Sequence, residues 1–121
     1  MVDDDAQVRA FAGAALDSLG HSVVQVASGP EALAAIRRAA PDAVLMDYAM
    51  PGMNGAEAAR LIEAEHPGLP IIFMTGYAET EDLGEDLGQS SIVLRKPFRV
   101  SELGVALSRA MAPKAIASGS A

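Results

Sequence analysis

The stretch 43–55 constrains the fold of this chain more than any other. Its first four residues are apolar and predict a short buried strand. Asp47 stands where that run ends, and a Pro/Gly/Asn-rich turn and a helical pattern over 56–65 follow it. This order places Asp47 at the carboxyl end of a strand, where open α/β sheets carry their chemistry. An aspartate at that position can cap the turn, ligate a metal or act as a carboxylate nucleophile.

The same alternation of strand and helix continues along the whole chain. Helical spacing of apolar residues predicts helices, with Asp5 and Ser28 as N-caps of the first two and Gly20 as the end of the first. These helices cover 6–19, 29–39, 56–65, 79–88 and 100–111, and the predicted strands cover 1–2, 22–27, 43–47, 69–75 and 91–95. Such alternation predicts an α/β fold with a parallel sheet and helices on both faces.

Composition narrows the class of protein. A chain of 121 residues that is 50% hydrophobic predicts one folded domain, which we place at 1–111, followed by a flexible C-terminal tail at 112–121. The net charge of −7 argues against direct nucleic-acid binding, and the absence of cysteine excludes disulfides and thiolate metal sites. We find neither a membrane span nor a signal peptide, so we expect a cytoplasmic protein.

Polar side chains follow four of the predicted strands. Asp3 and Asp4 come after the first strand, Asp47 after the third, Thr75 after the fourth and Lys96 after the fifth. Right-handed crossovers bring these strand ends to one edge of the sheet. Clustered carboxylates repel one another unless a cation joins them, and oxygen ligands without His or Cys favour Mg²⁺. A carboxylate beside Mg²⁺, a lysine and a hydroxyl suits phosphoryl transfer. One residue of this kind is explained by turn capping, but four at successive strand ends are not.

Five motifs follow one another along the chain: Val2-Asp3-Asp4-Asp5, Met46-Asp47, Met50-Pro51-Gly52-Met53-Asn54-Gly55, Thr75-Gly76 and Lys96-Pro97-Phe98. In this order, they resemble the motifs of the receiver domain of two-component response regulators, and the resemblance covers nearly the whole chain. The resemblance implies a flavodoxin-like fold with a five-stranded parallel sheet in the order 2-1-3-4-5, and two helices on one face with three on the other.

The resemblance also implies roles for the acidic residues. Asp47 would be the phosphoacceptor, phosphorylated from a phosphohistidine on a sensor histidine kinase or a phosphotransfer protein. Asp4 would bind Mg²⁺ directly, Asp3 would assist through water, and the backbone carbonyl of Ala49 would be a further ligand. The domain would catalyse its own phosphotransfer at most, and it would not be an enzyme in the ordinary sense.

Further roles are implied for the residues around the phosphoryl group. Thr75 would hydrogen-bond it and move inward on activation, Gly76 would leave room for it, and Lys96 would pair with it. The Lys96-Pro97 peptide would be cis.

The sequences of 74–78 and 94–98 are similar to those of receivers at the end of hybrid histidine kinases. Such a receiver acts through protein contacts, or withdraws phosphate from its own kinase, and it does not act through nucleic acid. We expect any homodimer to form through the last helix and strand.

The sequence departs from the family pattern at two places. Val93 stands where receivers usually have an aromatic rotameric switch, and valine has little rotameric range. The first strand is only Met1-Val2, where receivers have four or more apolar residues. We therefore expect a truncated first strand whose upstream piece is missing, with Phe11 and Leu107 uncovered.

Three other functions share some of these sequence features. Phosphoaspartyl hydrolases usually carry a second aspartate two residues after the nucleophile, where this chain has Ala49. A flavin-binding module needs a phosphate loop after the first strand, and the three aspartates there would repel a phosphate. A receiver-like protein-interaction module without phosphotransfer stays open, although such a module would typically have lost Asp47, Thr75 or Lys96.

Overall fold

Three parallel strands form the sheet at the centre of this computed structural model, which describes residues 1–50, 52–76 and 92–111. They are β1 (Val44–Asp47), β2 (Ile71–Thr75) and β3 (Ile92–Arg95), in the order β1-β2-β3. Val44 pairs with Ile71, and Ile72 pairs with Ile92. All four residues of β1 are buried, which explains why its first three are apolar without alternation.

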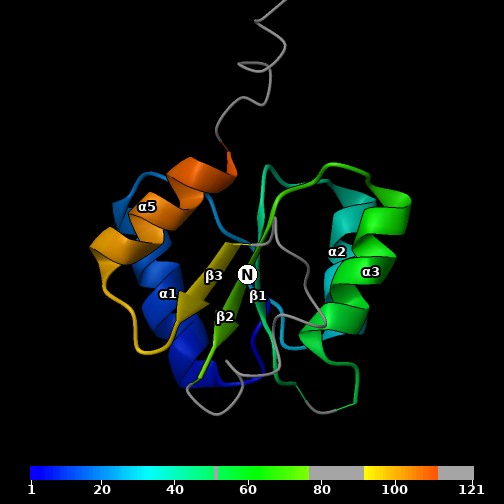
Figure 1. Ribbon diagram of the computed structural model, residues 1–121, viewed down its shortest axis with the longest axis horizontal. Coiled ribbons are helices and arrows are strands. Elements are labelled where there is room, and N and C mark those ends of the chain that lie inside the picture. Colours follow the sequence, from blue (N-terminus) through cyan, green and yellow to red (C-terminus); the bar gives the residue numbers. More distant parts are fainter. Residues whose placement is uncertain (51, 77–91, 112–121) are drawn as a thin grey trace, which may run out of the picture.

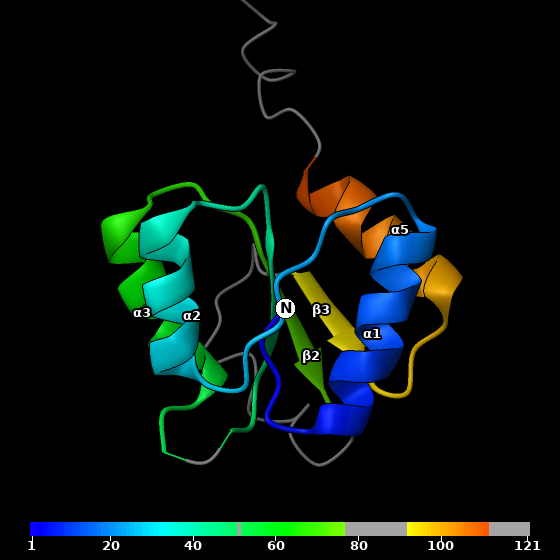
Figure 2. The same cartoon turned by 180° about the vertical axis from the view of Figure 1, so that it is seen from behind.

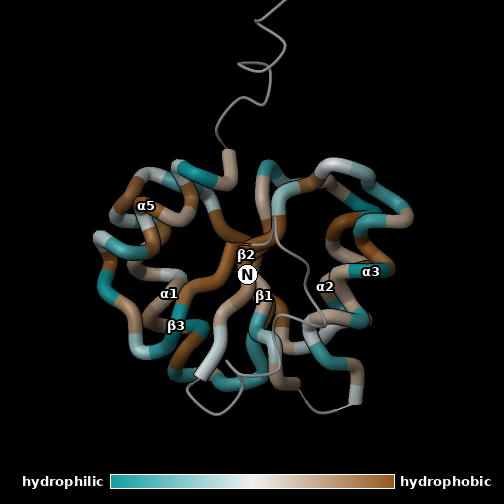
Figure 3. Tube along the Cα trace, viewed as in Figure 1, coloured by the Kyte–Doolittle hydropathy of each residue, from teal (hydrophilic) through white to brown (hydrophobic). Residues whose placement is uncertain are grey.

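Helices cover both faces of this sheet (Figures 1 and 2). α1 (Ala6–Ser18) and α5 (Val100–Ala110) lie on one face, and α2 (Gly29–Arg38) and α3 (Gly55–Glu65) lie on the other. Successive strand residues point to opposite faces, so β1 contributes to two cores. Leu45 packs in the α1/α5 core, whereas Val44 and Met46 pack in the α2/α3 core. Figure 3 shows the apolar residues concentrated along the strands between the two helix layers.

Local capping explains where the first two helices begin. The Asp5 side chain accepts hydrogen bonds from the N–H groups of Gln7 and Val8, and Ser28 accepts one from Glu31. These two predicted N-caps are confirmed. The Glu31 carboxylate bonds the N–H of Ala27 at 3.1 Å, one residue before the position that a capping box uses.

The predicted first and second strands are not formed as strands. Val2 makes isolated parallel bridges with Val26 on one side and Met46 on the other. Residues 22–25 have only a short extended segment beside them, so they do not form the run of backbone hydrogen bonds that defines a strand. The described residues contain three strands, so neither the predicted count of five strands nor the order 2-1-3-4-5 is confirmed.

Several predictions concern residues outside the described part of the chain. They are the helix at 79–88, the tail at 112–121 and the turn residue Pro51. Within the described ranges, each face of the sheet carries two helices. A search of the same ranges found no helix both long and apolar enough to cross a membrane.

Candidate functional site

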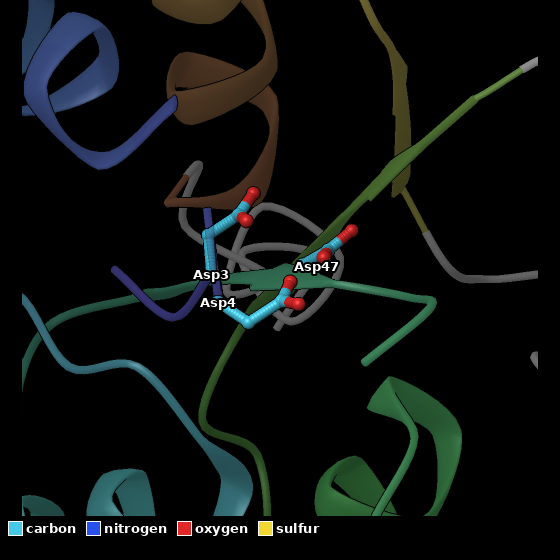
Figure 4. A group of neighbouring side chains, drawn as sticks. All are labelled: Asp3, Asp4 and Asp47. Carbon is cyan, nitrogen blue, oxygen red and sulfur yellow. The ribbon is translucent and has the colours of Figure 1, made fainter. Parts of the chain in front are cut away.

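Three aspartates meet at the carboxyl end of β1. Asp3 and Asp4 come from the N-terminal segment, and Asp47 is the last residue of β1 (Figure 4). One carboxylate oxygen from each of the three residues lies within 4.8 Å of the other two. Asp3 and Asp47 are buried, whereas Asp4 is exposed. The predicted convergence of these residues is therefore confirmed, and we call them the acidic cluster.

Lys96 joins the two buried members of the acidic cluster. Its Nζ lies 3.0 Å from Asp47 Oδ1 and 3.0 Å from Asp3 Oδ2. Lys96 follows β3, and its backbone N–H donates to the carbonyl of Thr75 at 2.7 Å. The Lys96-Pro97 peptide is cis, as the resemblance implied. One ammonium group faces three carboxylates, so two negative charges remain uncompensated among these four side chains when all are ionised.

Two groups at this site, Asp47 and Lys96, have shifted pKa values. Burial raises the pKa of Asp47 from 3.8 to about 6, and the negative charge of Asp3 adds to this effect while the Lys96 hydrogen bond opposes it. Burial also lowers the pKa of Lys96, but the Asp47 and Asp3 carboxylates outweigh it, so that pKa is raised overall. At neutral pH, Asp47 is therefore largely ionised and Lys96 is charged.

Asp3 is held by three hydrogen bonds besides its contact with Lys96. Its backbone N–H donates to the Val26 carbonyl at 3.2 Å. Its Oδ1 accepts the backbone N–H of Asp5 at 2.8 Å, and its carbonyl accepts a hydrogen bond from Arg9 Nη1 at 2.7 Å. The Arg9 contact was not predicted. The available signal was a basic residue in the second turn of a helix that begins beside three aspartates. Arg9 thus fixes the backbone from which the Asp3 carboxylate projects.

Thr75 contributes a buried hydroxyl at the same edge. It is the last residue of β2, and the preceding residue, Met74, pairs with Asp47. Its Oγ1 is buried and has no hydrogen-bond partner in the described part of the chain. Such a group costs about 1–3 kcal/mol when left unsatisfied, so an oxygen-bearing ligand that reached it would gain a hydrogen bond.

The arrangement can hold a metal ion. Three carboxylates provide an all-oxygen set with surplus negative charge, which suits a hard cation. Ala49 is exposed in the loop two residues after Asp47, and the part of its carbonyl in metal binding stays a prediction.

Comparison with known proteins agrees with this geometry. Residues 1–108 match the family described as the response regulator receiver domain. The chain belongs to this family.

Two curated relatives are much longer than this chain. The DNA-binding response regulator MtrA of Mycolicibacterium paratuberculosis is 38% identical over 105 residues, which are 85% of this chain and 46% of that protein. The DNA-binding transcriptional regulator NtrC of Klebsiella pneumoniae is 35% identical over 112 residues, 92% of this chain and 24% of that protein. This receiver therefore spans less than half the length of either relative. The predicted similarity to hybrid-kinase receivers is not confirmed.

Solved structures support the receiver fold. The receiver domain of NtrX from Brucella abortus superposes with a TM-score of 0.85 at 27% identity, covering 91% of this chain and 94% of that one. The beryllofluoride-activated receiver of NtrC gives a TM-score of 0.75 at 34% identity, covering 91% of this chain and 90% of that one.

Gly55 shapes the loop of this receiver behind Asp47. Its N–H donates to the carbonyl of Tyr48 at 2.7 Å, and a Cβ on Gly55 would lie 2.4 Å from the Asp47 carbonyl oxygen. From the sequence, Gly55 was only a turn residue. The structure shows that a side chain there would collide with the backbone that carries Asp47.

Proposed function

We propose that this receiver domain accepts a phosphoryl group on Asp47 from a phosphohistidine of a sensor histidine kinase or a phosphotransfer protein. The observation that carries the proposal is the acidic cluster with Lys96 bonded to Asp47. Membership of the receiver family supports it. The largely ionised state of Asp47 at neutral pH supplies the nucleophile that the reaction needs.

Asp3, Asp4 and Asp47 would hold Mg²⁺, with the carbonyl of Ala49 as a further ligand. When bound, the ion neutralises charge on the oxygens of the transferring group. One Asp47 carboxylate oxygen attacks phosphorus while the bond from phosphorus to the donor imidazole nitrogen breaks. The imidazole keeps the electron pair and then takes a proton from solvent.

Lys96 and Thr75 would receive the transferred group. Lys96 already lies 3.0 Å from Asp47 Oδ1, so its ammonium can pair with a phosphoryl oxygen after a small shift. The Thr75 hydroxyl, unpartnered among the described residues, would donate to another phosphoryl oxygen. Thr75 ends β2 and Lys96 follows β3, so both groups come from the same edge of the sheet as Asp47.

We propose that the phosphorylated domain signals through protein contacts. The relatives are named as DNA-binding proteins, but they extend well beyond the part that matches this chain. The net charge of −7 disfavours contact between this domain and nucleic acid. The outer surfaces of β3 and α5 expose Val93 and Val105, which are suited to a homodimer contact.

Incubation with acetyl phosphate and Mg²⁺, followed by intact-mass measurement, tests this function. We expect the mass to increase by one phosphoryl group in the wild type, but not in Asp47→Asn or in the presence of a chelator. Thr75→Ala should slow the reaction, while Thr75→Ser, which keeps the hydroxyl, should not. An unchanged mass in a folded sample would favour the interaction module without phosphotransfer.

A further inference from the structure

The loop between β1 and α3 contains Asn54-Gly55, an asparagine followed by a glycine. In such a pair, the backbone nitrogen of the glycine can attack the side-chain amide carbon of the asparagine, because glycine has no side chain to shield that nitrogen. Ammonia leaves, and a cyclic imide forms that water later opens. Asn54 is the only asparagine in the sequence, so deamidation of an asparagine can occur here alone.

Packing constrains both members of this pair. A Cβ on Gly55 would lie 2.4 Å from the Asp47 carbonyl oxygen and 2.8 Å from Tyr48 Cα, so only glycine fits there without movement of the chain. Asn54 is the N-cap of α3, and its Oδ1 accepts the N–H of Glu57 at 2.9 Å. An N-cap calls for a short side chain with an acceptor oxygen. A pair that is prone to deamidation is therefore built into the loop that follows Asp47.

The folded loop holds the nitrogen that would attack. The Gly55 N–H donates to the Tyr48 carbonyl at 2.7 Å, and Gly55 is buried. The nitrogen can attack only after it loses its proton to a base in solvent. Burial and the hydrogen bond both oppose this step, as they oppose amide hydrogen exchange, which needs the same removal of the proton. The reaction therefore requires the Gly55 N–H to separate from Tyr48.

The N-cap of α3 holds the amide that would be attacked. Asn54 and Glu57 form a capping box, in which the Asn54 side chain accepts from the Glu57 N–H, and the Glu57 carboxylate accepts from the Asn54 N–H at 3.3 Å. Closing the imide ring turns the Asn54 side chain toward the nitrogen that follows it, and this movement breaks its bond to the Glu57 N–H. Ring closure thus needs the cap to open together with the release of Gly55.

We propose that Asn54 is a deamidation site that the closed loop protects and that reacts when the N-cap of α3 opens. The Gly55 nitrogen forms a bond to Asn54 Cγ while the bond from Cγ to Nδ2 breaks, and the amide nitrogen leaves as ammonia with the proton that Gly55 gave up. Water then adds to one of the two carbonyl carbons of the imide and breaks its bond to nitrogen. One opening gives aspartate. The other gives isoaspartate, whose main chain runs through the former side chain.

The isoaspartate product lengthens the loop by a methylene carbon where the chain is tightly packed. Gly55 could then no longer keep both its bond to Tyr48 and its close approach to the Asp47 carbonyl. We expect a deamidated and refolded sample to melt several degrees below Asn54→Asp, which has the same charge on an unaltered main chain and keeps the cap. This inference does not depend on phosphotransfer, because it concerns the covalent chemistry and the stability of the loop.

Intact-mass measurement of samples incubated at mildly alkaline pH tests the proposal. We expect the folded wild type to deamidate about tenfold or more slowly than the same protein unfolded in guanidinium chloride. Glu57→Ala removes one half of the capping box and keeps the Asn54-Gly55 pair, so the folded variant should deamidate several-fold faster than the folded wild type. Glu63→Ala, at an exposed position on the same helix, is the control and should react like the wild type.

Asn54→Ser supplies an independent control, because it keeps an acceptor for the cap but has no amide to lose, so its mass should not change. A wild type that deamidates equally fast when folded and unfolded would overturn the proposal. So would an equal mass increase in Asn54→Ser, which would place the reaction at a glutamine. Equal rates for folded Glu57→Ala and folded Glu63→Ala would also overturn it, because the reaction would then be independent of the cap.

Discussion

At the scale of single residues, Asp47 is a buried carboxylate whose charge opposes folding. The folded protein keeps a proton on Asp47 up to about pH 6, whereas the unfolded chain loses it near 3.8. The stability that this proton supplies is complete below the lower value and is lost as the pH rises through the upper one. At about 1.4 kcal/mol for each pKa unit, the loss is ~3 kcal/mol.

Asp47→Asn should therefore stabilise the fold at neutral pH without Mg²⁺, because the amide removes the buried charge and its oxygen can still accept the Lys96 hydrogen bond. We expect its melting temperature to exceed that of the wild type by several degrees at neutral pH, and the difference to shrink as the pH falls from 6 to 4. Asp42→Asn, at an exposed position, is the control and should change little. A wild type as stable as Asp47→Asn at neutral pH would show that Lys96 fully offsets the burial cost.

Alanine substitutions at Gly55 and Gly104 form a matched pair that tests the effect of adding a Cβ at each position. Gly55→Ala forces a Cβ to within 2.4 Å of the Asp47 carbonyl oxygen, so the loop must move and we expect a loss of about 2–4 kcal/mol. At Gly104 in α5, the nearest atom would be a Leu19 methyl at 3.6 Å, so alanine should gain about 0.5–1 kcal/mol of helix propensity.

Urea unfolding of the two glycine variants measures both effects, and the phosphorylation assay reports on the site. Equal stability of the two variants would mean that the loop after β1 moves to accommodate the Cβ without lowering the free energy of unfolding. A slower phosphorylation in Gly55→Ala alone is expected, because its loop carries the backbone of Asp47.

At the scale of elements, β3 bears on how the proposed phosphorylation would affect the rest of the domain. Val93 lies on β3, pairs with Phe73 and is 40% exposed. A valine cannot move between exposed and buried positions as an aromatic ring can. Beryllofluoride with Mg²⁺ should therefore change the NMR shifts of Thr75 and Gly76 strongly and those of β3 and α5 weakly.

Asp47→Asn provides the control for that NMR experiment, because it should show no change on adding beryllofluoride. Shift changes along β3 and α5 as large as those at Thr75 would demonstrate that another side chain performs the switch. We name Tyr77, two residues after Thr75, as the first candidate for that side chain; it lies outside the described residues.

Helix positions could be predicted well because their signals are local. Asp5 and Ser28 cap the helices that they were expected to cap, and Gly20 ends the first helix region with a φ of +89°. The strand expected at 22–27 does not form, because a strand also depends on the strand that pairs with it. The apolar pattern of 22–27 carries no information about the length of that partner. Leu107, expected to be uncovered, is buried, while Phe11 is 48% exposed and contacts Phe98.

The acidic cluster could be predicted because topology, rather than local pattern, brings its members together. Once parallel strands were inferred, Asp3, Asp47 and Lys96 had to share one edge. The pairing of Lys96 with both aspartates, and the contact of Arg9 with Asp3, depend on side-chain geometry that no sequence spacing defines.

At the scale of the whole molecule, metal binding should stabilise the fold. A ligand at about ten times its dissociation constant adds ~1.4 kcal/mol, which corresponds to a rise of several degrees in melting temperature for a domain of this size. Asp4→Asn should weaken this response to Mg²⁺, because Asp4 belongs to the acidic cluster. Asp5→Asn should not weaken it, because Asp5 caps α1 and asparagine caps equally well.

Calorimetric titration with Mg²⁺ measures the same two variants directly. Equal weakening by Asp4→Asn and Asp5→Asn would show that the roles within the aspartate run are assigned wrongly. A wild-type melting temperature that does not change on adding Mg²⁺ would contradict the proposed Mg²⁺ site.

The three consecutive aspartates have a consequence for comparing this chain with its relatives. Asp3 contacts Lys96, Asp4 reaches the acidic cluster from an exposed position, and Asp5 caps α1. Because the three residues are identical, an alignment can place a gap before, within or after the run at the same score. A misplaced gap transfers each role to the wrong residue. The bridges of Val2 to Val26 and Met46 remove this ambiguity, since they fix the numbering of the run in space. Receivers with similar acidic runs are therefore best aligned on the apolar residue that precedes the run.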